Sequence, residues 1–305
     1  MNGLRLPLVL LGPTASGKSD VAMAYAAASS DREIVAVDAM QVYRGMDIGT
    51  AKPSAHDRSV VAHHCLDLIG PSDDGSVVEF AAAANDALEG IVHRGHRPVL
   101  VGGTGLYLRS ITDPMEVPGQ WPQVKAQLLA RADAEGTPTL HRQLATLDPV
   151  AATRIDPQNT RRVVRALEVT LGSGRPFSSF GPGLDQYPRV PFVQIGLQWP
   201  RPVLAARIEQ RVHGMMHAGL AAEVEGLWRG PTPLSRTARQ ALGYKELIDH
   251  LEGRCSLAEA VDTIIVRTRQ FAVRQERWFR RDPRVRWVHL EHDPVAEVLP
   301  LLPSP

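Results

Sequence analysis

The segment Leu6–Ser19 decides the fold and reads L-P-L-V-L-L-G-P-T-A-S-G-K-S. Its apolar beginning is typical of a buried parallel strand. The remainder matches the phosphate-loop pattern G-x-x-x-x-G-K-[ST], with Gly12 and Gly17 as its two glycines. An alanine-rich stretch that favours a helix follows directly. Because strand, loop and helix succeed one another in register, the segment indicates a phosphate site rather than a chance glycine turn.

A loop of this kind binds phosphate through its backbone. Glycines let successive N–H groups point at one anion, and the next helix adds the positive end of its dipole. We expect Lys18 to reach the terminal phosphate and Ser19 to hold Mg²⁺. The predicted phosphate-binding residues are Gly12, Pro13, Thr14, Ala15, Ser16, Gly17, Lys18 and Ser19. The pattern alone does not identify the phosphate compound.

The composition indicates a soluble protein with a core and a smaller additional part. The chain has 305 residues, of which 44% are hydrophobic and 22% are charged. No apolar run approaches the roughly 20 residues that span a bilayer, and no signal peptide precedes the first strand. Cys65 and Cys255 lack the spacing of a disulfide framework or a zinc site. We therefore expect a cytoplasmic monomer that does not associate with membranes.

Charge is unevenly distributed along the chain, although the net charge is only +1. Residues 1–120 contain 9 Lys and Arg against 14 Asp and Glu, a net −5, and the remainder contains 25 against 19, a net +6. Arginine makes up 30 of the 34 cations and suits forked contacts to phosphate. This asymmetry indicates that the C-terminal part meets a polyanion.

Short apolar runs alternate with helical patterns in the first third of the chain. Strands are predicted at residues 33–37, 65–69 and 99–101, and a helix is predicted at residues 77–94. Such alternation predicts βαβ units and a parallel sheet. The expected fold class is therefore α/β, with a P-loop NTPase-like parallel sheet as its core.

The character of the sequence changes after the fourth predicted strand, at residues 99–101. From residue 113 to 191 we expect an inserted, mainly helical subdomain with proline-rich connections. Its predicted helices cover residues 122–135, 139–147 and 160–171. A strand at residues 192–198 then returns the chain to the sheet, and a helical C-terminal part follows to the end. The core accordingly comprises residues 1–112 and 192–305.

Two strand ends carry the residues that decide between phosphate chemistries. An ordinary P-loop NTPase ends its second strand in a carboxylate that holds Mg²⁺. Here the strand at 99–101 ends in G-G-T, with Thr104 last, and Asp38 follows the neighbouring strand instead. Asp38 can cap a turn, bind Mg²⁺ through water or act as a general base. Small-molecule kinases carry similar residues, so a kinase is an open alternative at this point.

Basic segments favour a nucleic-acid partner. In Q-N-T-R-R-V-V-R, Arg161 and Arg165 share one helix face. A long helix expected to reach Arg281 adds further arginines with interleaved aromatic residues. This combination suits a nucleic-acid backbone, although a solvated charged face is the alternative for either segment alone.

The chain closely resembles the tRNA dimethylallyltransferases, in their bacterial short form, in the motifs G-P-T-A-S-G-K-S, V-D-A-M-Q-V-Y-R-G-M-D-I-G-T-A-K-P, V-G-G-T-G-L-Y, R-A-L-E-V and Q-A-L-G-Y-K-E-L. The resemblance covers nearly the whole chain, and D-I-G-T-A-K-P is highly specific. It implies transfer of a dimethylallyl group from its diphosphate to N6 of the adenosine just 3′ of the anticodon (tRNA position 37). Pyrophosphate would leave, and the phosphate loop would hold dimethylallyl diphosphate rather than ATP.

The resemblance also implies roles for single residues. Asp38 is the base for N6, while Lys18 and Thr104, with Mg²⁺ on Ser19, stabilise the departing pyrophosphate. The residues implied to contact the flipped adenine and the anticodon stem-loop are Asp38, Ala39, Met40, Gln41, Lys125, Arg161, Arg162, Arg165, Gly243, Tyr244 and Lys245. Arg239 is expected to meet either tRNA or pyrophosphate, and Arg277 stands where relatives often carry Thr.

Two other functions are weighed against this one. A P-loop small-molecule kinase, or an isopentenyltransferase acting on free adenine nucleotide, needs no RNA clamp. The inserted subdomain and its arginines therefore favour the tRNA enzyme. A plain RNA-binding module would explain the arginines but not a phosphate loop beside Asp38.

Overall fold

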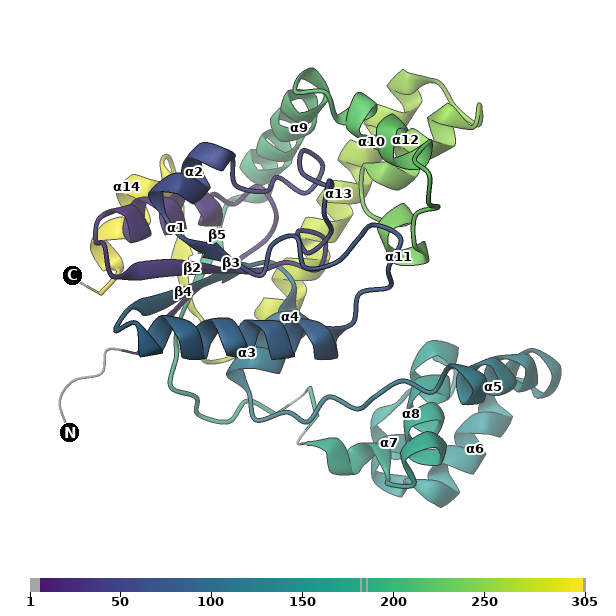
Figure 1. The fold of residues 1–305 in the computed structure, drawn as a ribbon. Coiled ribbons are helices and arrows are strands. Elements are labelled where there is room, and N and C mark those ends of the chain that lie inside the picture. The colour runs from purple at the N-terminus through teal and green to yellow at the C-terminus, as the bar shows by residue number, and fades with distance from the viewer. Residues whose placement is uncertain (1–5, 182, 185, 304–305) are drawn as a thin grey trace. The chain divides into compact units, whose positions relative to one another are not determined.

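The computed structural model describes residues 6–181, 183–184 and 186–303. The backbone divides into two units, which we call the core unit (Met1–Thr112 with Arg189–Pro305) and the helical unit (Asp113–Pro188); both are drawn in Figure 1. The sequence predicted a return to the core at residue 192, and the structural division falls at Arg189.

A parallel sheet forms the centre of the core unit and confirms the predicted α/β fold class. Within the described residues its six strands are β1 (Leu8–Leu11), β2 (Arg32–Val37), β3 (His63–His64), β4 (Arg97–Gly102), β5 (Val193–Gln198) and β6 (Arg286–His289). They lie in the order β3-β2-β4-β1-β5-β6, and each neighbouring pair is parallel. All residues of β1 are buried, as expected for a central strand covered on both faces.

The register of the central strands brings their carboxyl ends together. Gly102 of β4 pairs with Leu11 of β1 on one side and with Val37 of β2 on the other. A Cβ atom at Gly102 would lie 2.0 Å from the carbonyl oxygen of Val37, so only glycine permits this approach. The segments that follow β1, β2 and β4 therefore leave the sheet at one edge, where ligands of open α/β sheets bind.

Helices cover both faces of this sheet. The helical elements of the core unit are α1 (Lys18–Ala27), α2 (Ala55–Val60), α3 (Val77–His93), α4 (Gly105–Thr112), α9 (Arg201–His217), α10 (Leu220–Trp228), α11 (Arg236–Arg239), α12 (Tyr244–Leu251), α13 (Leu257–Phe279), α14 (Pro294–Val298) and the 3-10 turn η2 (Leu299–Leu301). In Figure 1, α1 and α14 lie on one face and α3 and α4 on the other. Across the described residues, no helix combines the length and apolar character needed to cross a bilayer.

The helical unit has its own hydrophobic core. Its elements are α5 (Pro122–Glu135), α6 (Thr137–Leu147), α7 (Pro149–Arg154), α8 (Thr160–Ser173) and the 3-10 turn η1 (Phe177–Phe180). Leu140, Leu144 and Leu167 are completely buried at its centre. Buried Asp148 accepts hydrogen bonds from the backbone N–H groups of Ala151 (3.0 Å) and Ser178 (2.7 Å). The predicted helices are confirmed, and the longest of them has the expected bounds.

The strand predicted at residues 65–69 is wrong. Cys65 and Asp67 have φ angles of +64° and +56°, which lie in the left-handed region and interrupt an extended chain. The pairing with β2 is made earlier, by His63 and His64 in β3. Ile69 forms only an isolated bridge with Tyr43. The segment is therefore a loop, in which Cys65 and Ile69 pack into the core and Leu68 is exposed.

A second correction concerns the C-terminal part, where only helices were expected. Residues 286–289 form the edge strand β6, which pairs with β5. Gly196 makes this contact possible, because a Cβ atom there would lie 2.8 Å from the Trp287 ring. A run of four residues is too short to show the alternation of apolar and polar residues that predicts a strand. The strand also depends on pairing with β5, which lies about 90 residues earlier in the chain.

A cluster of ionisable side chains surrounds the buried Glu33 of β2. Glu33 of β2 is 5% exposed and accepts two hydrogen bonds from Arg94, at 3.0 and 2.8 Å. Ring nitrogens of His64 and His96 lie 2.6 and 2.7 Å from its carboxylate oxygens. The bonds from Arg94, followed by those from the two histidines, lower the pKa of Glu33 to about 2, although burial opposes the shift.

We predict that Glu33→Gln removes an acid-sensitive part of the folding free energy. Because the pKa of Glu33 is about 2 in the folded chain and 4.5 without these partners, its carboxylate contributes about 3 kcal/mol above pH 4.5. This contribution is lost as the pH falls towards 2, and about 2 kcal/mol of it is gone at pH 3. Urea unfolding at pH 7, 5, 4 and 3 measures the difference between the wild type and the variant.

The exposed Glu89 of α3 supplies the matched control as Glu89→Gln. This control should follow the wild type at every pH. A wild-type advantage over Glu33→Gln that is the same at pH 7 and pH 3 would contradict the ion-cluster account.

Candidate active site

The phosphate-loop residues form a tight turn between β1 and α1. Gly12, Ala15 and Gly17 have φ angles of +150°, +61° and +89°. A Cβ atom at Gly12 would lie 2.9 Å from the carbonyl oxygen of Leu197, and one at Gly17 would lie 2.5 Å from Cγ of Pro294. Both glycines are therefore required by their backbone angles and by the close approach of other segments.

Two side chains that follow β5 donate hydrogen bonds to backbone carbonyls of the phosphate loop. The indole Nε1 of Trp199 donates to the carbonyl of Ser16 at 3.0 Å, and Nε of Arg207 donates to the carbonyl of Ala15 at 2.9 Å. The Arg207 guanidinium also lies over the Trp199 ring, 4.6 Å from its centroid. Two loop carbonyls are thus bonded within the protein. The sequence did not predict these contacts, because the partners are 183 and 192 residues apart.

Gln275 of α13 connects the phosphate loop with the end of β4. Its Oε1 accepts from the backbone N–H of Thr14 at 2.8 Å, and its Nε2 donates to the carbonyl of Gly103 at 2.9 Å. Cβ atoms at Gly103 and Gly105 would lie 2.3 Å from Gln275 and 2.0 Å from Trp278. The G-G-T-G motif therefore leaves room for α13. The N–H of Thr14, expected to face phosphate, is already bonded in this structure.

Lys18 and Arg211 lie within electrostatic range of each other and of two carboxylates, Asp38 and Asp20. Lys18 is half-buried, and its Nζ donates to the carbonyl of Pro13 at 3.2 Å. Burial and then the charge of Arg211 lower the pKa of Lys18 to about 8, while the two carboxylates oppose the shift. Burial also lowers the pKa of Arg211, again against Asp38 and Asp20. Two partly desolvated cations at the start of a helix favour an anion.

Arg211 was not among the residues predicted from the sequence. It lies four residues after Arg207 in α9, so both side chains share one helix face. The sequence R-I-E-Q-R contains this spacing and could have indicated Arg211.

Arg239 was expected near the diphosphate or tRNA, and it donates to the carboxylate of Glu252 at 2.6 Å. Among the described residues, Arg239 has no bond to the phosphate loop.

Asp38 and Thr104 occupy the adjacent strand ends. The N–H of Met40 donates to Oδ1 of Asp38 at 2.8 Å, and the N–H of Ala39 donates to Oγ1 of Thr104 at 3.2 Å. Asp38 therefore caps its own turn, as one of its predicted roles required. Its other oxygen, Oδ2, has no hydrogen-bond partner in the described part of the chain. One carboxylate oxygen thus holds the turn and the other is free to accept a proton.

The residues after Asp38 form a loop that closes on itself. Nε2 of Gln41 donates to the carbonyls of Thr50 and Ala51 at 3.1 and 3.2 Å. Met40 is half-buried and packs against the core. The amide nitrogen of Gln41 is therefore engaged, and its Oε1 has no hydrogen-bond partner among the described residues.

The motif around Tyr244 lies partly inside the protein. The Tyr244 side chain is completely buried, and its hydroxyl donates to Oε1 of Glu223 at 2.5 Å. The N–H of Gly243 donates to the carboxylate of Glu246 at 2.8 Å. Lys245 is half-buried. A direct RNA contact by the Tyr244 side chain, as the resemblance implied, is thus not possible in this conformation.

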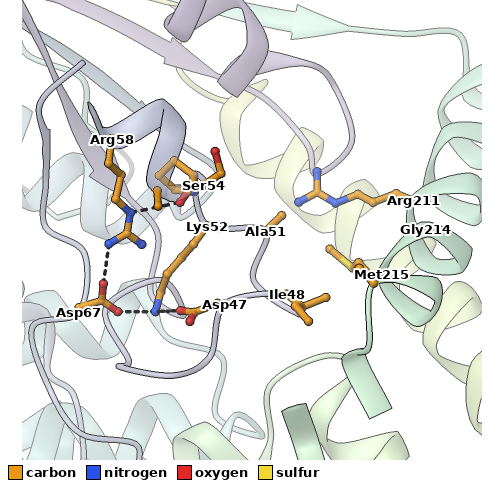
Figure 2. A pocket seen from close by; sticks show the side chains of 13 residues that line it. Asp47, Ile48, Ala51, Lys52, Ser54, Arg58, Asp67, Arg211, Gly214 and Met215 are labelled. Atoms are coloured by element: carbon orange, nitrogen blue, oxygen red, sulfur yellow. Dashed lines mark hydrogen bonds and ion pairs between the residues drawn. The ribbon is translucent and has the colours of Figure 1, made fainter. Parts of the chain in front are cut away.

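An open pocket of about 720 Å³ lies between the 47–58 segment and α9 (Figure 2). Its lining residues are Asp47, Ile48, Ala51, Lys52, Pro53, Ser54, Ala55, Arg58, Asp67, Arg211, Gly214, Met215 and Ala218. Ile48 and Met215 extend towards each other across it, while Lys52 pairs with Asp47 and Asp67 at one end. The pocket therefore combines an apolar section with the cation Arg211.

The predicted RNA contacts of the helical unit differ in their surroundings. Lys125 of α5 and both Arg161 and Arg162 of α8 are exposed. Arg165 donates to the carbonyls of Pro118 and Gly119, at 2.9 and 3.0 Å, and also pairs with the buried carboxylate of Glu168. Arg165 therefore stabilises the helical unit itself.

A metal site made only of protein side chains is absent from the described residues, where no group of three His, Cys, Asp or Glu could hold an ion. Ser19 is exposed in the first turn of α1. Mg²⁺ at phosphate sites takes most of its ligands from phosphate oxygens and water. One exposed hydroxyl at this position fits such an ion.

Comparisons with known proteins identify the family of the chain. Residues 41–282 match the family model described as IPP transferase. The tRNA dimethylallyltransferase of Kineococcus radiotolerans is 45% identical, over 98% of this chain and 97% of its own. The protein of the same name from Desulforudis audaxviator is 44% identical, over 93% and 92%.

Solved structures give the same result. The tRNA isopentenylpyrophosphate transferase of Bacillus halodurans superimposes with a TM-score of 0.69 at 36% identity, over 97% of this chain and 94% of that chain. A eukaryotic dimethylallyltransferase acting on tRNA shares the fold, with a TM-score of 0.78 at 24% identity, over 93% and 73%. The chain belongs to the tRNA dimethylallyltransferase family of prenyl-transferring enzymes.

Proposed function

We propose that this enzyme transfers the dimethylallyl group of dimethylallyl diphosphate to N6 of the adenosine just 3′ of the anticodon, at tRNA position 37. The observation that carries the proposal is the grouping of Lys18, Arg211 and Asp38 around the phosphate loop. The names of the relatives, which act on tRNA, support the same substrate. Because tRNA is its substrate, we place the enzyme in the cytoplasm, and we propose that it acts as a monomer.

The phosphate loop receives the diphosphate. As the bond between the allylic carbon and oxygen breaks, its electron pair leaves with pyrophosphate, and negative charge grows on the departing oxygens. Lys18, Arg211 and the loop N–H groups that are not bonded within the protein would face that charge, and Trp199 and Arg207 hold the loop in place. Donors and cations held in place before the reaction stabilise such charge more strongly than water does. Mg²⁺ bound through Ser19 would neutralise further diphosphate charge when present.

The apolar tail of the donor requires a non-polar wall near this anion site. Ile48, Met215 and Ala218 supply one in the pocket that also contains Arg211. A kinase would use the corresponding space for adenosine. Because small-molecule kinases carry similar residues at these strand ends, the end of β4 does not separate the two functions. The chain belongs to a prenyltransferase family, and we therefore favour the transferase over the kinase and over an enzyme acting on free adenine nucleotide.

Asp38 takes the proton of N6. The adenine amine is a weak nucleophile because its lone pair is delocalised into the ring, so a base must remove the proton as the nitrogen attacks. Oδ2 of Asp38 is free to accept it, while Oδ1 and Thr104 keep the turn in place. Met40 and Gln41, which follow directly, would hold the adenine after it has left the stacked anticodon loop.

The anticodon stem-loop is held by basic side chains. In the helical unit, the exposed Lys125, Arg161 and Arg162 are the groups available to phosphates. Arg165 pairs with Glu168 and thereby stabilises the helical unit that carries these side chains. In the core unit, Lys245 and Arg239 can add contacts, and the buried Tyr244 would act by supporting the loop beneath the RNA.

The transferase proposal predicts modification with dimethylallyl diphosphate and Mg²⁺ in the absence of ATP, with one pyrophosphate released per adenosine. Carbon-labelled donor, nucleotide-free enzyme and tRNA are incubated, and the tRNA is digested to nucleosides. Label should appear in N6-modified adenosine. Label that appears only when ATP is added and consumed would restore the kinase interpretation.

Asp38→Asn should slow the chemical step by roughly 10²- to 10⁴-fold, because the amide keeps the shape of the side chain but cannot accept a proton. Affinity for tRNA should change little. Single-turnover rates with saturating donor measure the effect, and Asp86→Asn on the exposed face of α3 is the matched control. A wild-type rate for Asp38→Asn would exclude the assignment of the base.

Arg162→Ala should weaken binding to all accepted tRNAs alike and reduce the slope of log affinity against log salt by about one, as expected for one lost phosphate contact. Arg131→Ala is the control in the same unit, because the charge of Arg131 is already paired with Glu135 at 2.8 Å. If both variants keep the wild-type slope, α8 presents a solvated face and not an RNA contact.

A further inference from the structure

One carboxylate outside the reacting groups is surrounded by donors from the loop between β2 and α2. Oε2 of Glu223 accepts from the backbone N–H groups of Asp47 (3.0 Å) and Ile48 (2.7 Å). Oε1 accepts from the N–H of Gly49 at 3.2 Å and from the hydroxyl of Tyr244 at 2.5 Å. Three successive N–H groups that point at one anion form an anion site, which the protein fills with its own side chain.

Tyr244 and Gly49 make this arrangement rigid. The Tyr244 ring is completely buried, and a Cβ atom at Gly49 would lie 2.5 Å from it. Burial, followed by the bond to Glu223, raises the pKa of Tyr244 far above its ordinary value. Its hydroxyl therefore stays protonated and remains a donor. No residue other than glycine fits between the ring and the carboxylate.

The anchored segment is joined to the residues proposed to face the adenine. The N–H of Ala51 donates to the carbonyl of Ile48 at 3.0 Å, which continues the turn held by Glu223. The carbonyls of Thr50 and Ala51 accept from Nε2 of Gln41. Nζ of Lys52, almost completely buried, donates to the carbonyl of Tyr43 at 2.5 Å. Displacement of the anchored segment would thus move Gln41.

Glu223 also connects the two sides of the pocket, one formed by the 47–51 segment and the other by the end of α9. Glu223 lies in the first turn of α10, where its own N–H donates to the carbonyl of Gly219 at 3.0 Å. Just before this turn, Met215 and Ala218 form one wall of the pocket, and Ile48 forms part of the opposite wall (Figure 2). Glu223 therefore bonds one wall to the helix that continues from the other.

We infer that Glu223 is a positioning residue for the transfer reaction: it holds the 47–51 segment against α10 and thereby keeps Gln41 and the pocket wall in their reactive places. Hydrogen bonds to a charged acceptor are the stronger ones, and removing the acceptor leaves the buried Tyr244 hydroxyl and the partly buried N–H groups of Ile48 and Gly49 unpaired. The phosphate loop uses other partners, so its anion site does not depend on Glu223. Only the expected change in the transfer rate rests on the proposed function; the expected change in hydrogen exchange does not.

The test compares Glu223→Ala with Glu223→Gln and Tyr244→Phe. The alanine variant removes all four acceptor contacts, the glutamine variant keeps one acceptor oxygen, and the phenylalanine variant removes one donor. Glu225→Ala is the matched control, because Glu225 lies on the same helix and pairs only with Arg229 among the described residues, at 2.9 Å. If the alanine variant does not fold, the two milder variants carry the test.

Hydrogen exchange without substrates gives the direct readout. In the wild type the amide protons of residues 47–49 should be protected, and in Glu223→Ala they should exchange about tenfold faster or more, with Glu223→Gln between the two. Single-turnover transfer to tRNA should fall about 10- to 100-fold in Glu223→Ala, because small misplacements of reacting groups have effects of this size. Calorimetric affinity for inorganic pyrophosphate, which needs the phosphate loop but not the pocket wall, should stay within about twofold.

Two results would overturn the inference. In the first, residues 47–49 keep wild-type protection in Glu223→Ala. In the second, protection is lost but transfer proceeds at the rate of the Glu225→Ala control, which would make Glu223 a structural residue without a role in positioning. A failure of the proposed function is a separate observation, since it would leave the wild type itself without tRNA transfer while the exchange experiment is unaffected.

Discussion

The approach of the β2 and β4 backbones at Gly102 is the constraint on which the site depends. The two strands and β1 end at the same level because Gly102 pairs with both Leu11 and Val37. A side chain at this position would collide with the carbonyl of Val37, at 2.0 Å. Asp38, Thr104 and the phosphate loop consequently begin side by side, and the three functional segments need no further rearrangement to meet.

Two loops at this edge use their backbone in opposite ways. In the phosphate loop, Trp199 and Arg207 donate to carbonyl groups, and the N–H groups of Thr14 and Ser16 are bonded to Gln275 and to the carbonyl of Pro13. In the 47–49 segment, all three N–H groups point at Glu223 of the same chain. The first loop keeps no anion of its own, as our proposal that it binds diphosphate requires, whereas the second holds a carboxylate of the protein. The difference follows from hydrogen-bond chemistry, because a backbone can offer its donors either to a ligand or to the protein.

Electrostatics explains why the first loop needs a ligand. Lys18 and Arg211 are partly desolvated, which lowers the pKa of each, and the nearby carboxylates of Asp38 and Asp20 oppose this only in part. A diphosphate would satisfy both cations and leave Asp38 free for proton transfer. Under the proposed function, the groups that would bind the leaving anion are thus distinct from the group that would accept the proton.

The sequence by itself determined the α/β class, the phosphate loop, Asp38, Thr104 and the helices of the inserted segment, because each depends on local period, spacing or glycine chemistry. The tertiary structure alone decided that 65–69 is a loop and that 286–289 is a strand. It also brought Arg211 near Lys18, Gln275 to the phosphate loop and Glu223 to the 47–49 segment. These features arise from contacts between residues tens to hundreds of positions apart, and neither the period nor the composition of a single segment contains that information. For the same reason only the folded chain revealed that Tyr244 is buried and that Arg165 is already paired.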